Sequence, residues 1–537
     1  MMPITNNIKR LGVVLMLSNL PLSVYADDKK LDLFDVVKAT LDNSPVLKIQ
    51  GFQVDVAKAA ERIQSGAFNV RIGGKVGYDN TKNTLFVPYE TLIPDPAKFS
   101  PPAVVGTTYP GGADFDIQSF QASAQKKSRS GITTKLQYDL NRRDPVGRSA
   151  TPTDNSYGTT SRGKVSLSIT VPLLKGGWEV SAGAAEKAAN LDYQAAAAKY
   201  KQLITSTLLG TVNAYWNYTA AYEILRQRIL IKERIESWVS SNHLEGFLTG
   251  FVQEKQGNVT TATQQLEQAR IALARVMGIP VDDALKLGTP DAENFPKDPE
   301  KLLETFDTKK AKQEWVELAM ENRNDLRANQ LSVESSETLL ARDQQDLYPE
   351  LTAAVGVGYN GISHGNGFDP YFDSSYRNVR DVDHSASLTF NYPIGNDAAE
   401  GVYDQDKAKK MVNTVTMNET KRGIKLSIEN SVATVYGRLK IVVQAKKTAY
   451  AYRDSLRDLF KKSDLSKPEE LSSIVILQQK LEDAIVAYVN SQADFANAIA
   501  QSRFEAGVLI SNAENSNLNA DINMDRVVSL PSLGKEL

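Results

Sequence analysis

The sequence of 537 residues contains no cysteine and only three histidines. The lack of cysteine excludes disulfide bonds, thiolate metal sites and an N-terminal cysteine that carries a lipid. The histidines, His243, His364 and His384, are too widely spaced for a metal-binding motif. A G-x-S-x-G nucleophile motif and a phosphate-binding loop are also missing. We therefore expect no cofactor and no metal site, and the sequence argues against an enzyme.

Strong charge and long hydrophobic runs are absent as well. The formal net charge is -2, which gives no basis for nucleic-acid binding. After residue 26, no stretch approaches the roughly 20 apolar residues that a membrane-spanning helix needs. Before it, Lys9 and Arg10 precede the apolar stretch 11–17, and a V-Y-A sequence ends at Ala26. This order predicts a secretory signal peptide over 1–26, against the alternative of a short buried helix. The mature protein would be exported, and any membrane crossing would be made by strands.

The feature that the chain does have is an internal repeat. Segments 37–78 and 316–359 both run from a helical pattern into alternation, and both end in V-G-Y. A second pair, 165–177 and 385–397, shares an alternating pattern and a proline at the same place. Each member of this second pair is followed by a long segment rich in Ala and Gln. The repeat predicts the order strand, strand, long helix, twice over.

Four segments alternate between apolar and polar residues: 69–79, 163–172, 350–360 and 384–394. In the second of them, Val165, Leu167 and Ile169 oppose serines and a threonine. Such alternation predicts strands with one apolar and one polar face. Each segment has about the 9–11 residues of a tilted transmembrane strand, and small polar residues opposite apolar ones are typical of outer-membrane barrels. A soluble antiparallel sheet with one wet face is the alternative.

Four strands cannot close a barrel, and open sheet edges cannot face lipid. In the barrel interpretation several chains share one barrel, and three chains would contribute twelve strands. The segment 80–162 interrupts the first pair of strands and is rich in Pro, Gly, Ser and Asp. We expect it to be an extracellular insertion. Whether its alternating part, 132–140, joins the barrel or forms a surface hairpin stays open.

Two segments without proline, 178–242 and 398–462, predict very long helices. Each has about 65 residues and would be roughly 100 Å long, which suits a coiled or stacked tube rather than a globule. The expected turns lie near 246–254 and 463–471. We expect 254–277 and 310–346 to form the return path beside the first long helix. The return path beside the second long helix would consist of 468–510 and 31–67. The aromatic set on the first long helix is expected to pack in a wall rather than to hold a ligand: Tyr215, Trp216, Tyr218 and Tyr222.

The ordered set of elements resembles the TolC-like outer membrane efflux protein family from about Leu31 to Gly507. The resemblance is carried by the repeat, by A-T-L-D-N-S-P-V-L at 39–47, by the strand exits V-P-L-L-K-G and Y-P-I-G, and by the helix 477–509. It implies an α+β membrane protein with four strands per protomer in a shared twelve-stranded trimeric β-barrel, continued by a long α-helical periplasmic barrel.

In function, the resemblance implies the exit duct of a tripartite efflux or type I secretion system in the Gram-negative outer membrane. The partners would be two further copies of the chain, outer membrane lipid, a periplasmic adaptor protein and an inner-membrane pump of the RND or ABC type. The expected organisation is a signal peptide 1–26, a first repeat 27–278, an equatorial linker 279–310, a second repeat 311–510 and a periplasmic tail 511–537.

The resemblance also suggests functional residues. Those similar to the family's tip motif for adaptor contact are Gly250, Phe251 and Val252. The acidic candidates for a tip constriction, which would favour cations if repeated around a ring, are Asp464, Glu469 and Glu470. The candidates for the junction between barrel and helices are Pro172, Pro349 and Pro393. The chain departs from the family at Gln253-Glu254-Lys255. The alternative is a secreted or periplasmic coiled-coil protein with a structural or adaptor role and no channel.

Overall fold

The computed structural model describes residues 30–86, 110–145, 159–241, 245–290, 295–296, 298–377, 379–462, 468–509 and 529–531. The predicted signal peptide and most of the predicted tail lie outside these residues. The chain divides into two compact units, each assembled from separate stretches of sequence. The first unit takes 1–45, 204–319 and 427–537, and the second takes 46–203 and 320–426. Each unit therefore draws on both sequence repeats.

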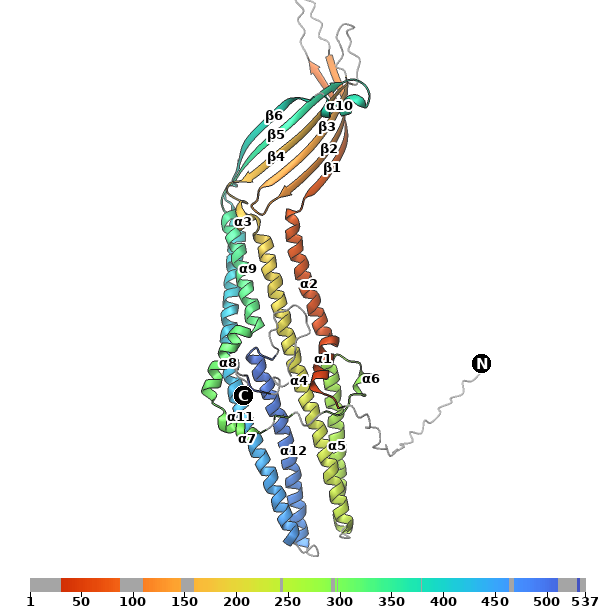
Figure 1. The fold of residues 1–537 in the computed structure, drawn as a ribbon, viewed down its shortest axis with the longest axis vertical. Helices are drawn as coiled ribbons and strands as arrows, with labels where there is room; N and C mark the ends of the chain where they lie inside the picture. Colours follow the sequence, from red (N-terminus) through yellow and green to blue (C-terminus); the bar gives the residue numbers. More distant parts are fainter. Residues whose placement is uncertain are drawn as a thin grey trace, which may run out of the picture. The chain divides into compact units, whose positions relative to one another are not determined.

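The second unit contains one antiparallel sheet with six strands in chain order (Figure 1). The strands are β1 (Arg71–Phe86), β2 (Pro110–Lys127), β3 (Thr133–Pro145), β4 (Thr160–Pro172), β5 (Glu350–His364) and β6 (Val379–Asn391). The four predicted strands correspond to β1, β4, β5 and β6. The prediction of four strands is wrong, because the insertion adds β2 and β3 between β1 and β4. The alternating segment 132–140 thus belongs to the sheet. In β2 the pattern changes phase, since Phe115 and Ile117 lie on one face and Phe120 on the other.

Four helices of the second unit form a layer that continues the sheet. They are α2 (Pro45–Ser65, followed by the 3-10 turn η2, Gly66–Phe68), the first part of α4 (Ala184–Ser241, after the short α3, Trp178–Ala182), α9 (Asn324–Asp346) and the first part of α11 (Asp397–Lys462). Side-chain hydrogen bonds establish their order. Asn190 of α4 donates to Glu61 of α2 at 2.8 Å. Ser335 of α9 donates to the carbonyl of Ala188 at 3.3 Å, and Asn413 of α11 donates to Ser336 at 2.9 Å. The order is therefore α2–α4–α9–α11.

The first unit is helical. It contains α1 (Leu33–Asn43), the rest of α4, α5 (Glu245–Met277), α6 (Val281–Ala284), α7 (Pro299–Thr305), most of α8 (Thr308–Asn322), the rest of α11, and α12 (Pro468–Glu505). The long helices α4 and α11 have 58 and 66 residues, close to the prediction. Among the described residues, no helix is both long and apolar enough to span a membrane.

Three of the four aromatic residues expected to pack in a wall lie in the core of the first unit, and the fourth, Tyr222, is half-buried. Tyr215, Trp216 and Tyr218 are almost fully buried. The hydroxyls of Tyr215 and Tyr218 donate to the carbonyls of Leu31 and Gly288, both at 3.1 Å. Trp216 stacks on the ring of Phe295. Because buried hydroxyl groups need such acceptors, these contacts hold the connecting segments against the long helix.

Two details of the predicted helical path are wrong. The segment 246–254 is not a turn, because α5 begins at Glu245 and includes it. The far end of α5 lies against α1, whereas we expected 31–67 to share the path of 468–510. Gly278 ends α5 with a positive φ of 72°, and a Cβ there would lie 3.0 Å from the carbonyl oxygen of Asn43. A glycine is needed for this helix end and this close approach.

A pair of buried carboxylates links α9 to α11 in the second unit. Asp343 accepts hydrogen bonds from Arg342 through Oδ1, while its Oδ2 has no donor. Burial and the neighbouring Asp406 raise the pKa of Asp343. Burial also disfavours the charge of Asp406, but the hydrogen bond from Lys409, at 2.7 Å, and the interaction with Asp343 outweigh it and lower the pKa of Asp406. A single proton shared by two adjacent carboxylates has this effect.

The two carboxylates should make opposite contributions to stability. A raised pKa means that the folded protein binds a proton that the unfolded chain releases above about pH 4. Asp343 therefore stabilises the fold at low pH, and this stabilisation is lost as the pH rises through its raised pKa. We expect Asp343→Asn to remove this dependence of stability on pH and to raise the melting temperature at neutral pH. Thermal unfolding in detergent measures both.

Asp406→Asn is the matched control with the opposite sign. Its lowered pKa stabilises the fold above the unfolded value of about 4, and this stabilisation is lost as the pH falls. We expect Asp406→Asn to lower the melting temperature at neutral pH. The unfolding free energy should fall by roughly 1.4 kcal/mol for each unit of pKa shift removed. Equal effects of the two substitutions would contradict the shared proton.

Candidate functional site: the two-faced sheet and the helix-hairpin tip

The register of the sheet sorts its side chains onto two faces. Directly paired residues of an antiparallel sheet lie on the same face. One row of pairs runs through all six strands, from Gly74 through Ala122, Tyr138, Val165 and Tyr359 to Val382. Large exposed hydrophobic residues of this face form what we term the apolar band: Ile72, Val76, Tyr78, Phe120, Leu136, Val165, Leu167, Ile169, Val355, Tyr359, Val382, Leu388 and Phe390.

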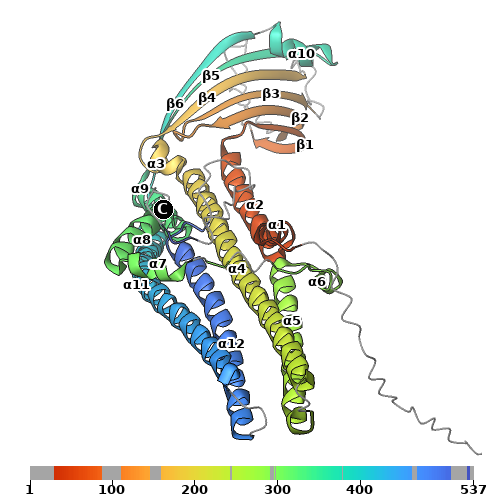
Figure 2. The same ribbon diagram turned by 60° about the horizontal axis from the view of Figure 1, so that its bottom comes forward.

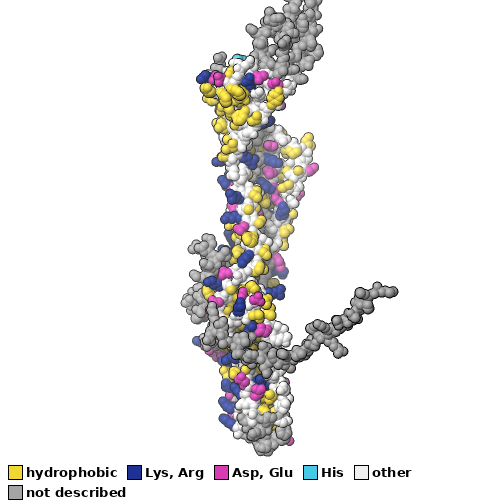
Figure 3. All heavy atoms as spheres, turned by 90° about the vertical axis from the view of Figure 1, so that its right-hand side faces the viewer, with side chains coloured by type: hydrophobic (Ala, Val, Ile, Leu, Met, Phe, Trp, Pro, Cys, Tyr) yellow, Lys and Arg dark blue, Asp and Glu magenta, His cyan; other side chains and the backbone are white. Residues whose placement is uncertain are grey.

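The apolar band is strongly exposed in the single chain. Ile72 is 86% exposed and Leu388 is 66% exposed. A face of this kind extends over six strands, far beyond the scattered apolar residues of an ordinary surface. Figure 3 shows hydrophobic side chains gathered in the upper part of the second unit, where Figure 1 places the sheet.

The opposite face carries small and polar residues. A Cβ on Gly77 would lie 2.6 Å from Ser119 Oγ, and one on Gly356 would lie 2.7 Å from Ser385 Oγ. The glycines thus leave room for serines on the neighbouring strands. One charged pair on this face forms across strands: Lys164 contacts Asp383 at 3.0 Å, and Asn360 also donates to Asp383. This face is therefore hydrophilic.

The three predicted junction prolines lie at one rim of the sheet. Pro172 ends β4 opposite Thr352, and Pro349 directly precedes β5. The amide of Leu173 donates to the carbonyl of Leu351 at 2.7 Å. Pro393 follows β6, whose last residue pairs with the first residue of β5. The prolines therefore stand where strands give way to helices, although their role there stays a prediction.

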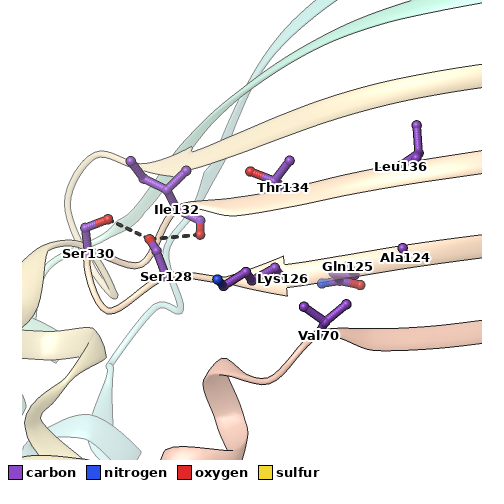
Figure 4. Close-up of a pocket in the computed structure, with 9 residues that line it drawn as sticks. All are labelled: Val70, Ala124, Gln125, Lys126, Ser128, Ser130, Ile132, Thr134 and Leu136. Carbon is purple, nitrogen blue, oxygen red and sulfur yellow. Dashed lines mark hydrogen bonds between the residues drawn. The ribbon is translucent and has the colours of Figure 1, made fainter.

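A pocket of about 600 Å³ opens at the same rim (Figure 4). Its lining residues are Val70, Ala124, Gln125, Lys126, Ser128, Ser130, Ile132, Thr134 and Leu136. Lys126 is the one ionisable side chain in this lining, so the pocket offers no acid–base pair. Ser128 accepts or donates a hydrogen bond with Ser130 at 2.7 Å and bonds the carbonyl of Ile132, which shapes the β2–β3 turn. Among the described residues, no three His, Asp or Glu side chains gather as a metal site would require.

The predicted tip residues lie where the α4–α5 and α11–α12 hairpins end side by side (Figures 1 and 2). Gly250 is exposed and has open space around it. Phe251 and Val252 pack against a buried cluster that joins the two hairpins: Ile231, Ile235, Val239, Leu248 and Leu471. Glu469 is exposed and Glu470 half-buried in the first turn of α12. The third acidic candidate, Asp464, lies outside the described residues.

The tip contains a buried ion pair that the sequence reasoning missed. Lys255 of α5 and Glu482 of α12 are 2% and 3% exposed, and their Nζ and Oε2 atoms are 2.7 Å apart. Asn258 donates to the second carboxylate oxygen at 3.0 Å, and Arg228 of α4 lies 3.9 Å from that oxygen. Lys255 also sits 4.6 Å above the ring of Phe251. The group therefore joins three helices.

One signal of this ion pair was present in the sequence. Lys255 belongs to the three residues that depart from the family pattern, and it follows Phe251 by four positions, so both lie on one helix face. Its partner is 227 residues away. No local pattern connects the two segments, so the pairing required the fold.

Comparison with known proteins gives a structural answer only. No family model matches the chain, and no curated protein matches it. Among solved structures, the chain is similar to the CusC channel. The match covers 90% of this chain and 93% of the CusC chain, at 9% identity and a TM-score of 0.57. The match to the outer membrane protein VceC of Vibrio cholerae covers 88% of this chain and 96% of the VceC chain, at 14% identity and a TM-score of 0.55.

The Campylobacter jejuni CmeC outer membrane channel is similar to the same extent. The match covers 89% of this chain and 85% of the CmeC chain, at 14% identity and a TM-score of 0.55. The chain has the fold of the TolC-like outer membrane channels. At such identities the match establishes the fold alone.

The buried ion pair leads to a prediction about stability. Lys255→Met should destabilise the protein by about 3–5 kcal/mol, because it leaves the carboxylate of Glu482 buried without its nearest cation. The double variant K255M/E482M should recover most of the loss, since it removes both charges together. Unfolding by urea or heat in detergent measures both effects.

Lys286→Met is the control, because Lys286 forms an exposed i,i+3 pair with Asp283 at 3.1 Å. An exposed pair contributes at most about 1 kcal/mol, so this variant should unfold like the parent. A double variant as unstable as Lys255→Met would contradict the proposed pairing energetics.

Proposed function

We propose that the chain is an outer membrane channel that serves as the exit duct of a tripartite efflux or type I secretion system. The supporting observation is the apolar band, which is exposed on every strand of a sheet whose other face is polar. A lipid-facing band opposite a hydrophilic lumen explains both faces. In this function the duct passes substrates and makes or breaks no bonds.

Closure of the wall requires further copies of the chain. β1 and β6 are the edges of the sheet, and open edges cannot face hydrocarbon. The two outer helices of the layer, α2 and α11, also expose apolar residues that no other described helix of the chain covers. Exposed apolar residues follow α2 at helical spacing, including Ile49, Phe52 and Val56, and follow α11 at Met411 and Val415. These features favour a ring in which β6 and α11 of one copy meet β1 and α2 of the next.

Three copies of the described sheet would give an eighteen-stranded barrel instead of the twelve strands expected from the sequence. Strands about 4.8 Å apart and tilted by about 40° each occupy about 6.3 Å of the wall, so six strands span about 38 Å. Four helices at axial distances of 8–10 Å span about 32–40 Å. Six strands, rather than four, therefore match the width of the helix layer α2–α4–α9–α11.

The tip is the proposed site of contact with a periplasmic adaptor, which would connect the duct to an inner-membrane pump. Gly250 favours this role because it is exposed and has no neighbour over it. Phe251 and Val252 support the surface from below through the buried cluster. Glu469 and Glu470, with Asp464, remain candidates for a cation-selective constriction.

The lipid-facing assignment predicts a contrast between neighbouring residues of β4. Leu167→Arg places a charge in the apolar band and should cost roughly 2–4 kcal/mol near the bilayer midplane. Ser168→Arg places the same charge on the opposite face, so assembly should survive while ion conductance changes. Yield of heat-resistant oligomer and single-channel conductance are the two measurements. Equal tolerance of both substitutions would argue against the barrel.

The first experiment on the whole protein is its mass in detergent followed by reconstitution in planar bilayers. A trimeric mass with discrete, cation-preferring conductance supports the duct. A dimeric mass with conductance would retain the channel and reduce the barrel to twelve strands. A water-soluble species without conductance would favour the alternative, a periplasmic coiled-coil scaffold or adaptor.

A further inference from the structure

A short helix covers one end of the apolar face of the sheet. α10 (Asp369–Tyr376) lies between β5 and β6 in sequence and packs on β3, β4 and β5 (Figure 1). The hydroxyls of Ser375 and Tyr138 are 2.6 Å apart, and Arg142 donates to the carbonyl of Gly367 at 2.7 Å. Tyr138 belongs to the row of pairs that includes Val165, so α10 lies on the side of the apolar band.

The contact between α10 and the sheet is close and specific. A Cβ on Gly163 would lie 2.6 Å from Ser375 Oγ and 3.1 Å from the carbonyl oxygen of Ser374, so only glycine fits beneath the helix. Leu140 of β3 and Ser161 of β4 are buried, unlike the exposed residues of the apolar band. Such packing fixes the helix on the wall.

The remaining surface of α10 is divided into two stripes. Aromatic residues at i, i+4 and i+8 form one stripe: Phe368, Phe372 and Tyr376, which are 80%, 54% and 64% exposed. Charged residues at the next positions form the other: Asp369, Asp373 and Arg377, of which the last two pair at 3.4 Å. An apolar stripe beside a charged stripe is typical of helices that lie in a membrane interface.

The height of α10 on the wall agrees with such an interface. Ten residues separate Val171, near the junction rim of β4, from Ser161 under α10. At about 3.3 Å per residue and a tilt of about 40°, this distance corresponds to about 25 Å along the membrane normal, the height of an outer-membrane apolar band. Aromatic residues collect at both limits of that band.

The geometry points to α10 as a lipid anchor, an interfacial helix on the outside of the wall that places Phe368, Phe372 and Tyr376 at the boundary between lipid head groups and acyl chains. This inference rests on the proposed function, because it takes the apolar band as the lipid-facing surface. The occupant of the aromatic stripe is membrane lipid. The height of α10 at the limit of the apolar band, where aromatic residues meet lipid head groups, favours lipid over a second protein.

The test uses the absence of cysteine, which makes each introduced cysteine the single labelling site. Phe372→Cys and Tyr376→Cys are labelled with an environment-sensitive fluorophore, and the full-length protein is reconstituted in phosphatidylcholine vesicles. The vesicles contain lipids with a spin label either in the head group or deep in the acyl chain. We expect quenching by the head-group label to exceed quenching by the deep label, and a blue-shifted emission. Because both side chains are exposed, the substitutions should not disturb folding.

Three further labels separate this inference from the proposed function. Leu167→Cys, in the apolar band, should be quenched most by the deep label, and Ser168→Cys, on the opposite face, by neither. Asp369→Cys, on the charged stripe of α10, should be quenched less than Phe372→Cys. If Leu167→Cys and Ser168→Cys behave as expected but neither α10 label is quenched, the lipid anchor is wrong and the channel stands. If Leu167→Cys is not quenched, the lipid-facing assignment fails and the anchor fails with it.

Discussion

Backbone hydrogen-bonding groups cannot be left unpaired against hydrocarbon, and in the proposed channel this constraint organises the whole chain. A sheet with one exposed apolar face and two open edges satisfies it only when the edges are joined to other copies. The other features fit the proposed closed wall. In it the polar face would enclose a lumen, the rim prolines lie where the strands end, and the helix layer would have to continue a ring of the same width.

Much of this architecture could be predicted from sequence, because the signals are periodic. Strict alternation located four of the six strands, although β1 extends seven residues beyond its predicted end, and the lack of proline located α4 and α11. The place of β3 was left open although its alternation was noted, and β2 was missed for a physical reason. In β2, Ile117 and Phe120 are three residues apart and point to opposite faces, so the apolar pattern changes phase. A phase change removes the signal on which single-strand prediction depends, although the pairing with β1 and β3 holds the strand in register.

The tip was predicted less well, because its chemistry is tertiary. Resemblance to a family directed attention to Gly250, Phe251 and Val252, yet two of these side chains pack inward. The residue that joins the helices there is Lys255, whose partner Glu482 comes from the opposite hairpin. A buried lysine is tolerated only when a carboxylate and further hydrogen bonds meet it, and a linear sequence does not reveal that meeting. The same limit applies to Asp343 and Asp406, which interact across α9 and α11.

Matching edges in strands and helices have a consequence for assembly. An edge strand rich in glycine, such as β1 with Gly73, Gly74 and Gly77, specifies its pairing register weakly on its own. Short connections link β1 to α2 and β6 to α11, so a slip by one residue in the ladder would also displace the apolar stripes of both helices. Strand slippage moves a whole face from lipid to lumen, whereas helix packing tolerates only shifts of a full turn. The helix layer therefore selects the register that the glycine-rich edge cannot select alone.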